Sequence, residues 1–189
     1  MHGFVLGIFV DEIINQCEFA LISSEYLQES LKRLKNKGQW SPEDNNRCFY
    51  HIQSFLIAVA IISKILWPNQ RKKKFRIRGE ELRRRLQVHV NSPIKDKYFR
   101  NVFEHYDKEI EKWAGSSKRK NYSDMNISIG GFSAIPEMDP IDNMRNLDIS
   151  RDGKNLTLTF HGDSHNLTVT ETALKELLER AKILRPNLW

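Results

Sequence analysis

Cysteine, glycine and proline are scarce in this chain of 189 residues. It contains 2 Cys, 9 Gly and 6 Pro, while 40% of its residues are hydrophobic and 29% are charged. This composition excludes a collagen-like repeat, a low-complexity chain and a wholly disordered chain. Because Cys17 and Cys48 are the only two cysteines and lie on different segments, the sequence also argues against a disulfide framework and a zinc site. We expect a soluble globular protein of the reducing cytoplasm, with no metal and no cofactor.

A long apolar run is missing as well. The longest stretch lies between Phe55 and Trp67 and already contains Ser63 and Lys64, so it is shorter than the ~20 residues that a bilayer span needs. The N-terminal sequence MHGFVLGIFVDEII has no basic segment and soon reaches two acids, which is not the pattern of a signal peptide. We therefore expect a cytoplasmic protein that does not enter a membrane.

The positive charge is concentrated in one segment. Residues 71–100 hold twelve Lys or Arg against three acids, a net charge of +9, whereas the whole chain carries +6 and the remainder therefore carries −3. Such a segment favours a polyanionic partner, nucleic acid before membrane, and the alternative is a solvated loop and helix face. The residues expected to hold a nucleic-acid backbone are Lys72, Lys73, Lys74, Arg83, Arg84 and Arg85.

The first part of the chain has the apolar period of α-helices. Residues repeat at spacings of three and four, with capping Ser and Pro residues before two of the runs. The predicted helices cover residues 11–37, 42–67, 79–90 and 93–115. Four amphipathic helices with short to medium connections predict a mainly α fold with a helical bundle in residues 1–115.

The second part of the chain changes to the period of β-strands. Apolar residues alternate with polar ones, and Asp152-Gly153 and Gly162-Asp163 lie between the runs as hairpin turns. The predicted strands cover residues 147–149, 156–160 and 167–169, with a further short strand at 126–129. A last helix at 171–184, capped by Thr170, completes a small antiparallel meander in residues 116–189 that packs on the bundle.

One pair of residues in the fourth predicted helix suits RNA chemistry. Attack by a ribose hydroxyl needs a proton shuttle and a cation for the charge that develops on phosphate, and His105 and Arg100 supply both. The spacing alone is weak, since chance gives it ~0.4 times in this composition and Arg84 and His89 repeat it. Only the copy at Arg100 is followed directly by an Asn, Asn101.

Residues 8–115, with this motif, resemble the HEPN family of helical-bundle proteins. Its nuclease members carry an Arg, a polar residue, three more residues and a His on the last long helix, as Arg100, Asn101 and His105 do here. The resemblance implies a four-helix bundle, a homodimer and a metal-independent ribonuclease, including toxins held by an antitoxin partner. His105 is then the general acid or base, Arg100 stabilises the charged phosphorane, and Asn101 orients His105 or the phosphate.

Other interpretations of the same residues remain open. The bundle can be a non-enzymatic nucleotide-binding or protein-interaction module of HEPN type, or a structural protein with a basic face. Arg100 can form an ordinary surface ion pair with Glu104 or Asp96, which lie one helical turn away. His105 can be a half-buried helix residue with a satisfied nitrogen.

Overall fold

The computed structural model describes residues 3–37, 41–68, 72–130 and 140–188. The chain forms two compact units, and each is built from separate stretches of sequence. Unit 1 comprises Met1–Glu29, His51–Lys97 and Thr170–Trp189, and unit 2 comprises Ser30–Tyr50 and Tyr98–Val169. The expected domain boundary after residue 115 falls within unit 2 and stays a prediction.

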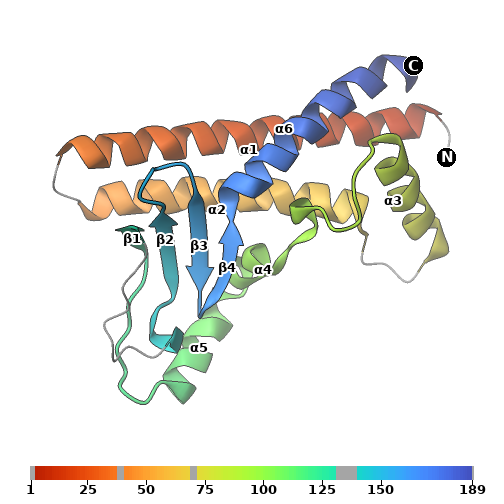
Figure 1. Ribbon diagram of the computed structural model, residues 1–189. Helices are drawn as coiled ribbons and strands as arrows, with labels where there is room; N and C mark the ends of the chain where they lie inside the picture. Colours follow the sequence, from red (N-terminus) through yellow and green to blue (C-terminus); the bar gives the residue numbers. More distant parts are fainter. Residues whose placement is uncertain (1–2, 38–40, 69–71, 131–139, 189) are drawn as a thin grey trace. The chain divides into compact units, whose positions relative to one another are not determined.

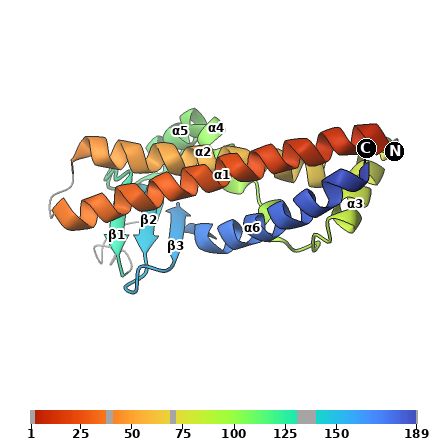
Figure 2. The same cartoon turned by 90° about the horizontal axis from the view of Figure 1, so that it is seen from above.

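Two long helices and the C-terminal helix form most of unit 1. Helices α1 (Gly3–Lys37) and α2 (Pro42–Leu66) run side by side, with α6 (Leu167–Leu184) along α1 (Figures 1 and 2). Their facing residues form the core, and those of α1 in this unit are Leu6, Val10, Ile13, Cys17, Ala20 and Leu27. The predicted first helix is confirmed over 11–37 and begins earlier, at Gly3.

Helix α2 begins at the cap that the sequence predicts. The Asp44 N–H donates to Ser41 Oγ at 3.2 Å, while the Ser41 N–H donates to Asp44 Oδ2 at 3.4 Å, which together form a capping box. By length and composition α2 could span a bilayer, but 61% of its apolar window is buried inside the protein. That burial is typical of a core helix of a soluble protein.

Helix α3 (Lys73–Arg85) differs from the predicted helix at 79–90. It begins six residues earlier, so that Gly79 lies in its middle and not at its start. A Cβ at Gly79 would lie 2.5 Å from the Leu66 carbonyl oxygen and 2.7 Å from Pro68 Cδ. The glycine is therefore required by the close approach of α3 to the end of α2, which the sequence pattern could not show.

The predicted fourth helix at 93–115 is broken into three pieces. These are the 3-10 turn η1 (Pro93–Lys95), α4 (Tyr98–Glu104) and α5 (Tyr106–Ser116). His105 separates the last two with φ −119° and ψ 35°. The break lets α4 contact strand β4 through Phe99 and His165, while α5 contacts strand β3 through Tyr106 and Phe160.

Unit 2 contains a four-stranded mixed sheet with the order β1-β2-β3-β4. The strands are β1 (Asn126–Ile129), β2 (Arg145–Ile149), β3 (Leu156–Phe160) and β4 (Asp163–Asn166). The predicted antiparallel pairing of β2 with β3 is confirmed. The third antiparallel strand is β4 and not the predicted segment 167–169, and β1 pairs with β2 in parallel. The two-residue turn between β3 and β4 lies at His161 and Gly162, which both have positive φ. This is one residue before the predicted turn at Gly162-Asp163, because Asp163 begins β4. The 3-10 turn η2 (Pro140–Asp142) precedes β2.

The last strand and the last helix begin at other residues than expected. Residues 167–169, predicted as a strand, form the first turn of α6. Its cap is Asn166, whose Oδ1 accepts the Val169 N–H at 2.9 Å, while the predicted cap Thr170 is buried inside the helix. The alternation of Leu167 and Val169 is compatible with a strand, but the hydrogen bond to the Asn166 side chain starts the helix at Leu167.

The fold is thus mainly helical, with a small sheet followed by a C-terminal helix, as expected. The specific four-helix bundle is not confirmed, because its third helix has other bounds and its fourth is interrupted at His105. After α6 the chain continues in a 3-10 turn, η3 (Arg185–Leu188). Cys17 and Cys48 are buried free thiols, and burial raises their pKa values to about 12 and about 11.

A buried ion pair joins two segments of unit 2. Arg145 of β2 contacts Asp124 through Nε at 2.8 Å and Nη2 at 2.5 Å, and both side chains are less than one-fifth exposed. The guanidinium also lies over the rings of Phe49, Phe103 and Tyr106, 4.6 Å from the last. Burial alone would raise the pKa of Asp124, but hydrogen bonding and the charge of Arg145 outweigh it and lower that pKa.

We predict that Asp124→Asn destabilises the protein by about 3 kcal/mol, because it leaves the Arg145 charge buried without its counterion. Denaturant unfolding monitored by circular dichroism measures this change. The matched control is Glu176→Gln, which breaks the exposed pair of Arg180 and Glu176 on α6 and should cost less than about 1 kcal/mol. Equal destabilisation in both variants would contradict the assignment of Asp124 as a structural anchor.

Candidate nucleic-acid interface

The first turn of α3 has the wrong charge for a helix N-terminus. Lys72 is its N-cap residue and makes no side-chain capping bond, Lys73 and Lys74 follow, and the first turn contains no acid. All three lysines are exposed. Because the N-terminal end of a helix dipole is itself positive, these charges add to it, and an anion there is favoured.

A cleft of about 350 Å³ lies in unit 1 beside α3. Its walls come from the end of α2, from α3 and from the segment around η1, and its lining residues are Trp67, Pro68, Arg76, Glu80, Arg83, Lys95 and Lys97. Among these described residues, four cations face a single carboxylate, so together they carry a charge of +3 at neutral pH. An aromatic wall with a surplus of cations is the composition of a site for a phosphate-bearing ligand.

Two of these cations also satisfy the end of α2. Lys97 Nζ donates to the Trp67 carbonyl oxygen at 3.1 Å, and the Arg83 guanidinium donates to the Leu66 carbonyl oxygen. Arg83 also lies 5.4 Å from the centre of the Trp67 ring. The last carbonyls of a helix lack partners within the helix, and cations at this end are favoured by its dipole.

The other two cations of the cleft, Arg76 and Lys95, do not cap the end of α2. Arg76 and Lys95 are exposed, and in the described part of the chain neither forms an ion pair. The backbone of Lys95 is fixed, because Ser63 Oγ of α2 donates to its carbonyl oxygen at 2.9 Å. These two side chains therefore carry the charge that is available to an anionic ligand.

The basic residues predicted from sequence divide into three groups. Arg83 lines the cleft, whereas Lys72, Lys73 and Lys74 lie at the start of α3 outside its lining. Arg84 and Arg85 contact Glu81 at 3.0 Å and 2.6 Å, and their hydrogen bonds lower the pKa of that carboxyl to about 2. The prediction missed Arg76, Lys95 and Lys97, although Lys95-Asp-Lys97 was visible as a basic pair after a helix-capping Ser-Pro.

The three residues of the RNA-cleavage motif lie in unit 2, where α4 meets α5. Arg100, one-fifth exposed, forms an ion pair with Glu104 and donates from Nη1 to Asn101 Oδ1 at 3.1 Å. The Asn101 carbonyl oxygen accepts the His105 N–H at 3.1 Å, and the His105 side chain is exposed. Asn101 therefore contacts the Arg100 side chain, and the described residues show no side-chain contact between Arg100 and His105.

Sequence reasoning missed a polar network between α5 and the sheet of unit 2. Trp113 Nε1 and Ser117 Oγ both donate to Asp142 Oδ1, at 2.8 Å and 2.5 Å. Nearby, His161 Nδ1 lies 3.5 Å from Glu109 Oε2, and its Nε2 lies 2.9 Å from the sulfur of Met144. The contacts of this network join residues that are 17 to 52 positions apart, and such isolated residues give no sequence signal.

This network is structural in character. Its groups are mostly buried. Tyr106 of α5 is a further partly buried polar residue: its hydroxyl lies 2.9 Å from that of Tyr122, and burial raises its pKa. The described residues contain no group of three or more His, Cys, Asp or Glu side chains placed to hold a metal ion.

Comparison with protein-family models, with curated proteins and with solved structures finds no significant match. The likeness to HEPN proteins consequently rests on the motif at Arg100, Asn101 and His105 and on its place in the chain, and it stays a prediction.

Acid should weaken unit 2 through His161. Burial lowers the pKa of His161 from its ordinary value of 6.5, so below that pH the unfolded chain binds a proton that the folded chain excludes. Stability therefore rises with pH across this range and falls on acidification. We predict that His161→Asn, which tolerates the positive φ of 47°, flattens the change in urea midpoint between about pH 5 and pH 7. An unchanged slope would show that His161 is not the titrating group.

Proposed function

We propose that this protein binds RNA or a similar polyanion through the cleft beside α3. The observation that carries the proposal is the convergence of Arg76, Arg83, Lys95 and Lys97 on one cleft against a single carboxylate. Lys72, Lys73 and Lys74 add positive charge at the first turn of α3, although Lys74 lines a separate pocket that α3 forms with Val5 and Phe9 of α1.

The chemistry of the cleft favours recognition of backbone over bases. Arg and Lys side chains contact phosphate oxygens without reading sequence, and none of the lining residues that the structure describes is an amide that could pair with base edges. Trp67 supplies an apolar wall, although Arg83 lies over its ring. Binding of this kind is tolerant of sequence and depends strongly on salt, because each neutralised phosphate releases counterions.

We predict that Arg76→Gln with Lys95→Gln weakens binding to single-stranded RNA. The slope of log affinity against log salt should become shallower by about 1 for each phosphate that the variant no longer neutralises. These two side chains have no ion pair in the described structure, so their replacement should leave the fold intact. Fluorescence anisotropy across a salt series measures both quantities, and circular dichroism checks the fold.

The matched control removes two cations of α6 that lie outside the cleft, Lys175→Gln with Arg180→Gln, and should leave the salt slope almost unchanged. Arg84→Gln with Arg85→Gln should have a smaller effect than the cleft variant, because Glu81 already neutralises part of their charge. If the α6 variant weakens binding as much as the cleft variant, net charge and not the cleft attracts RNA.

The second candidate function is RNA cleavage of the HEPN type. It is favoured by the exposed His105 at the junction of α4 and α5 and by the contact of Arg100 with Asn101. His105 would move the proton, Arg100 would stabilise the charged phosphorane, and Asn101 would hold Arg100 in place. For this role, Arg100 would have to release Glu104, or contact Glu104 and the phosphate at the same time. A homodimer and an antitoxin partner belong to this scheme.

Cleavage predicts a specific set of defects. His105→Ala and Arg100→Ala should each abolish cutting of RNA while RNA affinity stays within about twofold, because both groups act mainly in the transition state. Cutting should survive excess EDTA and leave a cyclic phosphate end, as mass spectrometry of the products can show.

Arg84 and His89 provide the control for this motif, since they repeat its spacing and His89 lies beyond the end of α3. Arg84→Ala with His89→Ala should therefore cut RNA as fast as the wild type. If the wild type binds RNA but cuts none under any condition, the cleavage hypothesis is wrong and the protein is a binding module.

A further inference from the structure

Helix α1 carries a second apolar stripe on the face opposite to its buried one. The stripe follows spacings of three and four through six positions, Val5, Ile8, Glu12, Asn15, Phe19 and Ile22. The four apolar members are exposed by 41%, 50%, 56% and 48% in chain order. All six belong to unit 1, so the stripe is a feature of that unit alone.

Alternating spacings of three and four define the a and d positions of a coiled coil. The core-facing residues of α1, such as Val10, Ile13 and Cys17, occupy other positions of the same heptad and pack within the chain. A single exposed apolar residue needs no explanation, but four in heptad register over about 26 Å of helix form a seam for a second helix.

The order of apolar and polar residues along the seam is the same from either end: two apolar, two polar and two apolar residues. In an antiparallel pair of α1 helices with the twofold axis between Ile13 and Ile14, each a position faces a d position of the other copy. Val5 then faces Ile22, Ile8 faces Phe19, and Glu12 faces Asn15, so that apolar residues meet apolar ones and the two polar residues meet each other. A parallel pair would place Glu12 against Glu12, which like charges disfavour.

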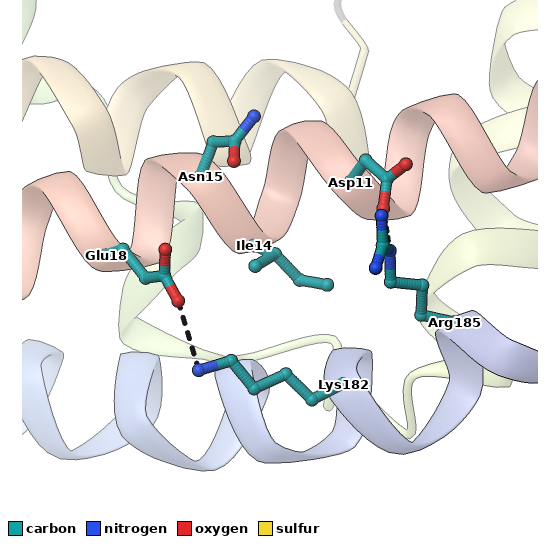
Figure 3. A pocket seen from close by; sticks show the side chains of 6 residues that line it. All are labelled: Asp11, Ile14, Asn15, Glu18, Lys182 and Arg185. Carbon is teal, nitrogen blue, oxygen red and sulfur yellow. Dashed lines mark hydrogen bonds and ion pairs between the residues drawn. The ribbon is translucent and has the colours of Figure 1, made fainter.

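The charges beside the seam are neutralised within the chain. Figure 3 shows Asp11 and Glu18 of α1 facing the C-terminal segment, where Lys182 contacts Glu18 at 3.0 Å and Arg185 contacts Asp11. These four residues line a pocket of about 440 Å³, and Asn15 points away from Lys182 and Arg185. Within the seam, Gln16 Nε2 donates to Glu12 Oε1 at 2.9 Å. Asp11 and Glu18 are thus paired within the chain, and Glu12 is the charged residue of the seam itself. A mostly apolar seam with paired acids beside it does not call for a strongly basic partner and suits a second copy of the same surface.

We propose that α1 is a dimerisation helix, which pairs antiparallel with α1 of a second copy through Val5, Ile8, Glu12, Asn15, Phe19 and Ile22. The interface is isologous, because each copy contributes the same six residues. It stands independently of RNA binding and of the motif at His105.

Analytical ultracentrifugation of the full chain at micromolar concentrations tests the proposal. The wild type should be a dimer, and Ile22→Lys should be a monomer with unchanged circular dichroism. Ile183→Lys is the matched control, since Ile183 is 72% exposed on α6 and lies outside the seam, and it should remain a dimer. A monomeric wild type would overturn the proposal and would favour a helix of another protein as the partner of the seam. A dimeric Ile22→Lys variant would overturn it as well.

Cysteine cross-linking tests the orientation. An equal mixture of Val5→Cys chains and Ile22→Cys chains should form a disulfide between unlike chains, whereas each variant alone should not, because like positions lie about 26 Å apart in the antiparallel pair. Cys17 and Cys48 are buried and do not compete. Cross-linking of Val5→Cys with itself would show a parallel pair or a different interface and would refute the antiparallel seam.

Discussion

The C-terminal end of α2 is the constraint on which unit 1 depends. The last carbonyls of this helix lack partners inside it, and Arg83 and Lys97 satisfy two of them from α3 and from the segment after η1. Gly79 lets α3 come close enough for this contact. The same packing that completes a buried helix therefore collects cations on one cleft, and the cations beyond the two that cap α2 create its surplus charge.

Burial decides what the charged residues of the two units can do. In unit 2, Arg145 is enclosed by aromatic rings and paired with Asp124, so its charge serves to hold β2 to the chain around it. In unit 1, Arg76 and Lys95 keep their charge in contact with solvent. Guanidinium and ammonium groups are equally visible in a sequence, but exposed ones without a counterion attract an anionic ligand more strongly than buried or paired ones.

The sequence predicted the elements that depend on local signals and missed those that depend on packing. Helical periodicity and the Ser41 cap are local and appear in the structure, and the turn after β3 appears one residue earlier than the predicted Gly162-Asp163. The break at His105 depends on contacts of α4 and α5 with different strands, and the start of α3 depends on the approach to α2. The basic character of segment 71–100 is also local, and the sequence predicts it. Which of its cations line the cleft depends on packing: Lys95 and Lys97 line it, whereas Arg84 and Arg85 are paired with Glu81.

Helix α1 shows how one sequence can carry two patterns at once. Its buried residues satisfy the core of unit 1 and account for the helical period by themselves. Val5 also lines a pocket beside α3, but folding of a single chain gives no reason for Ile8, Phe19 and Ile22 to be apolar, because burying apolar surface stabilises only when water is removed from it. Their heptad register, with polar residues at the centre and apolar residues at both ends, is explained by a helix that meets its own copy. The constraint on this face of α1 is then association and not folding.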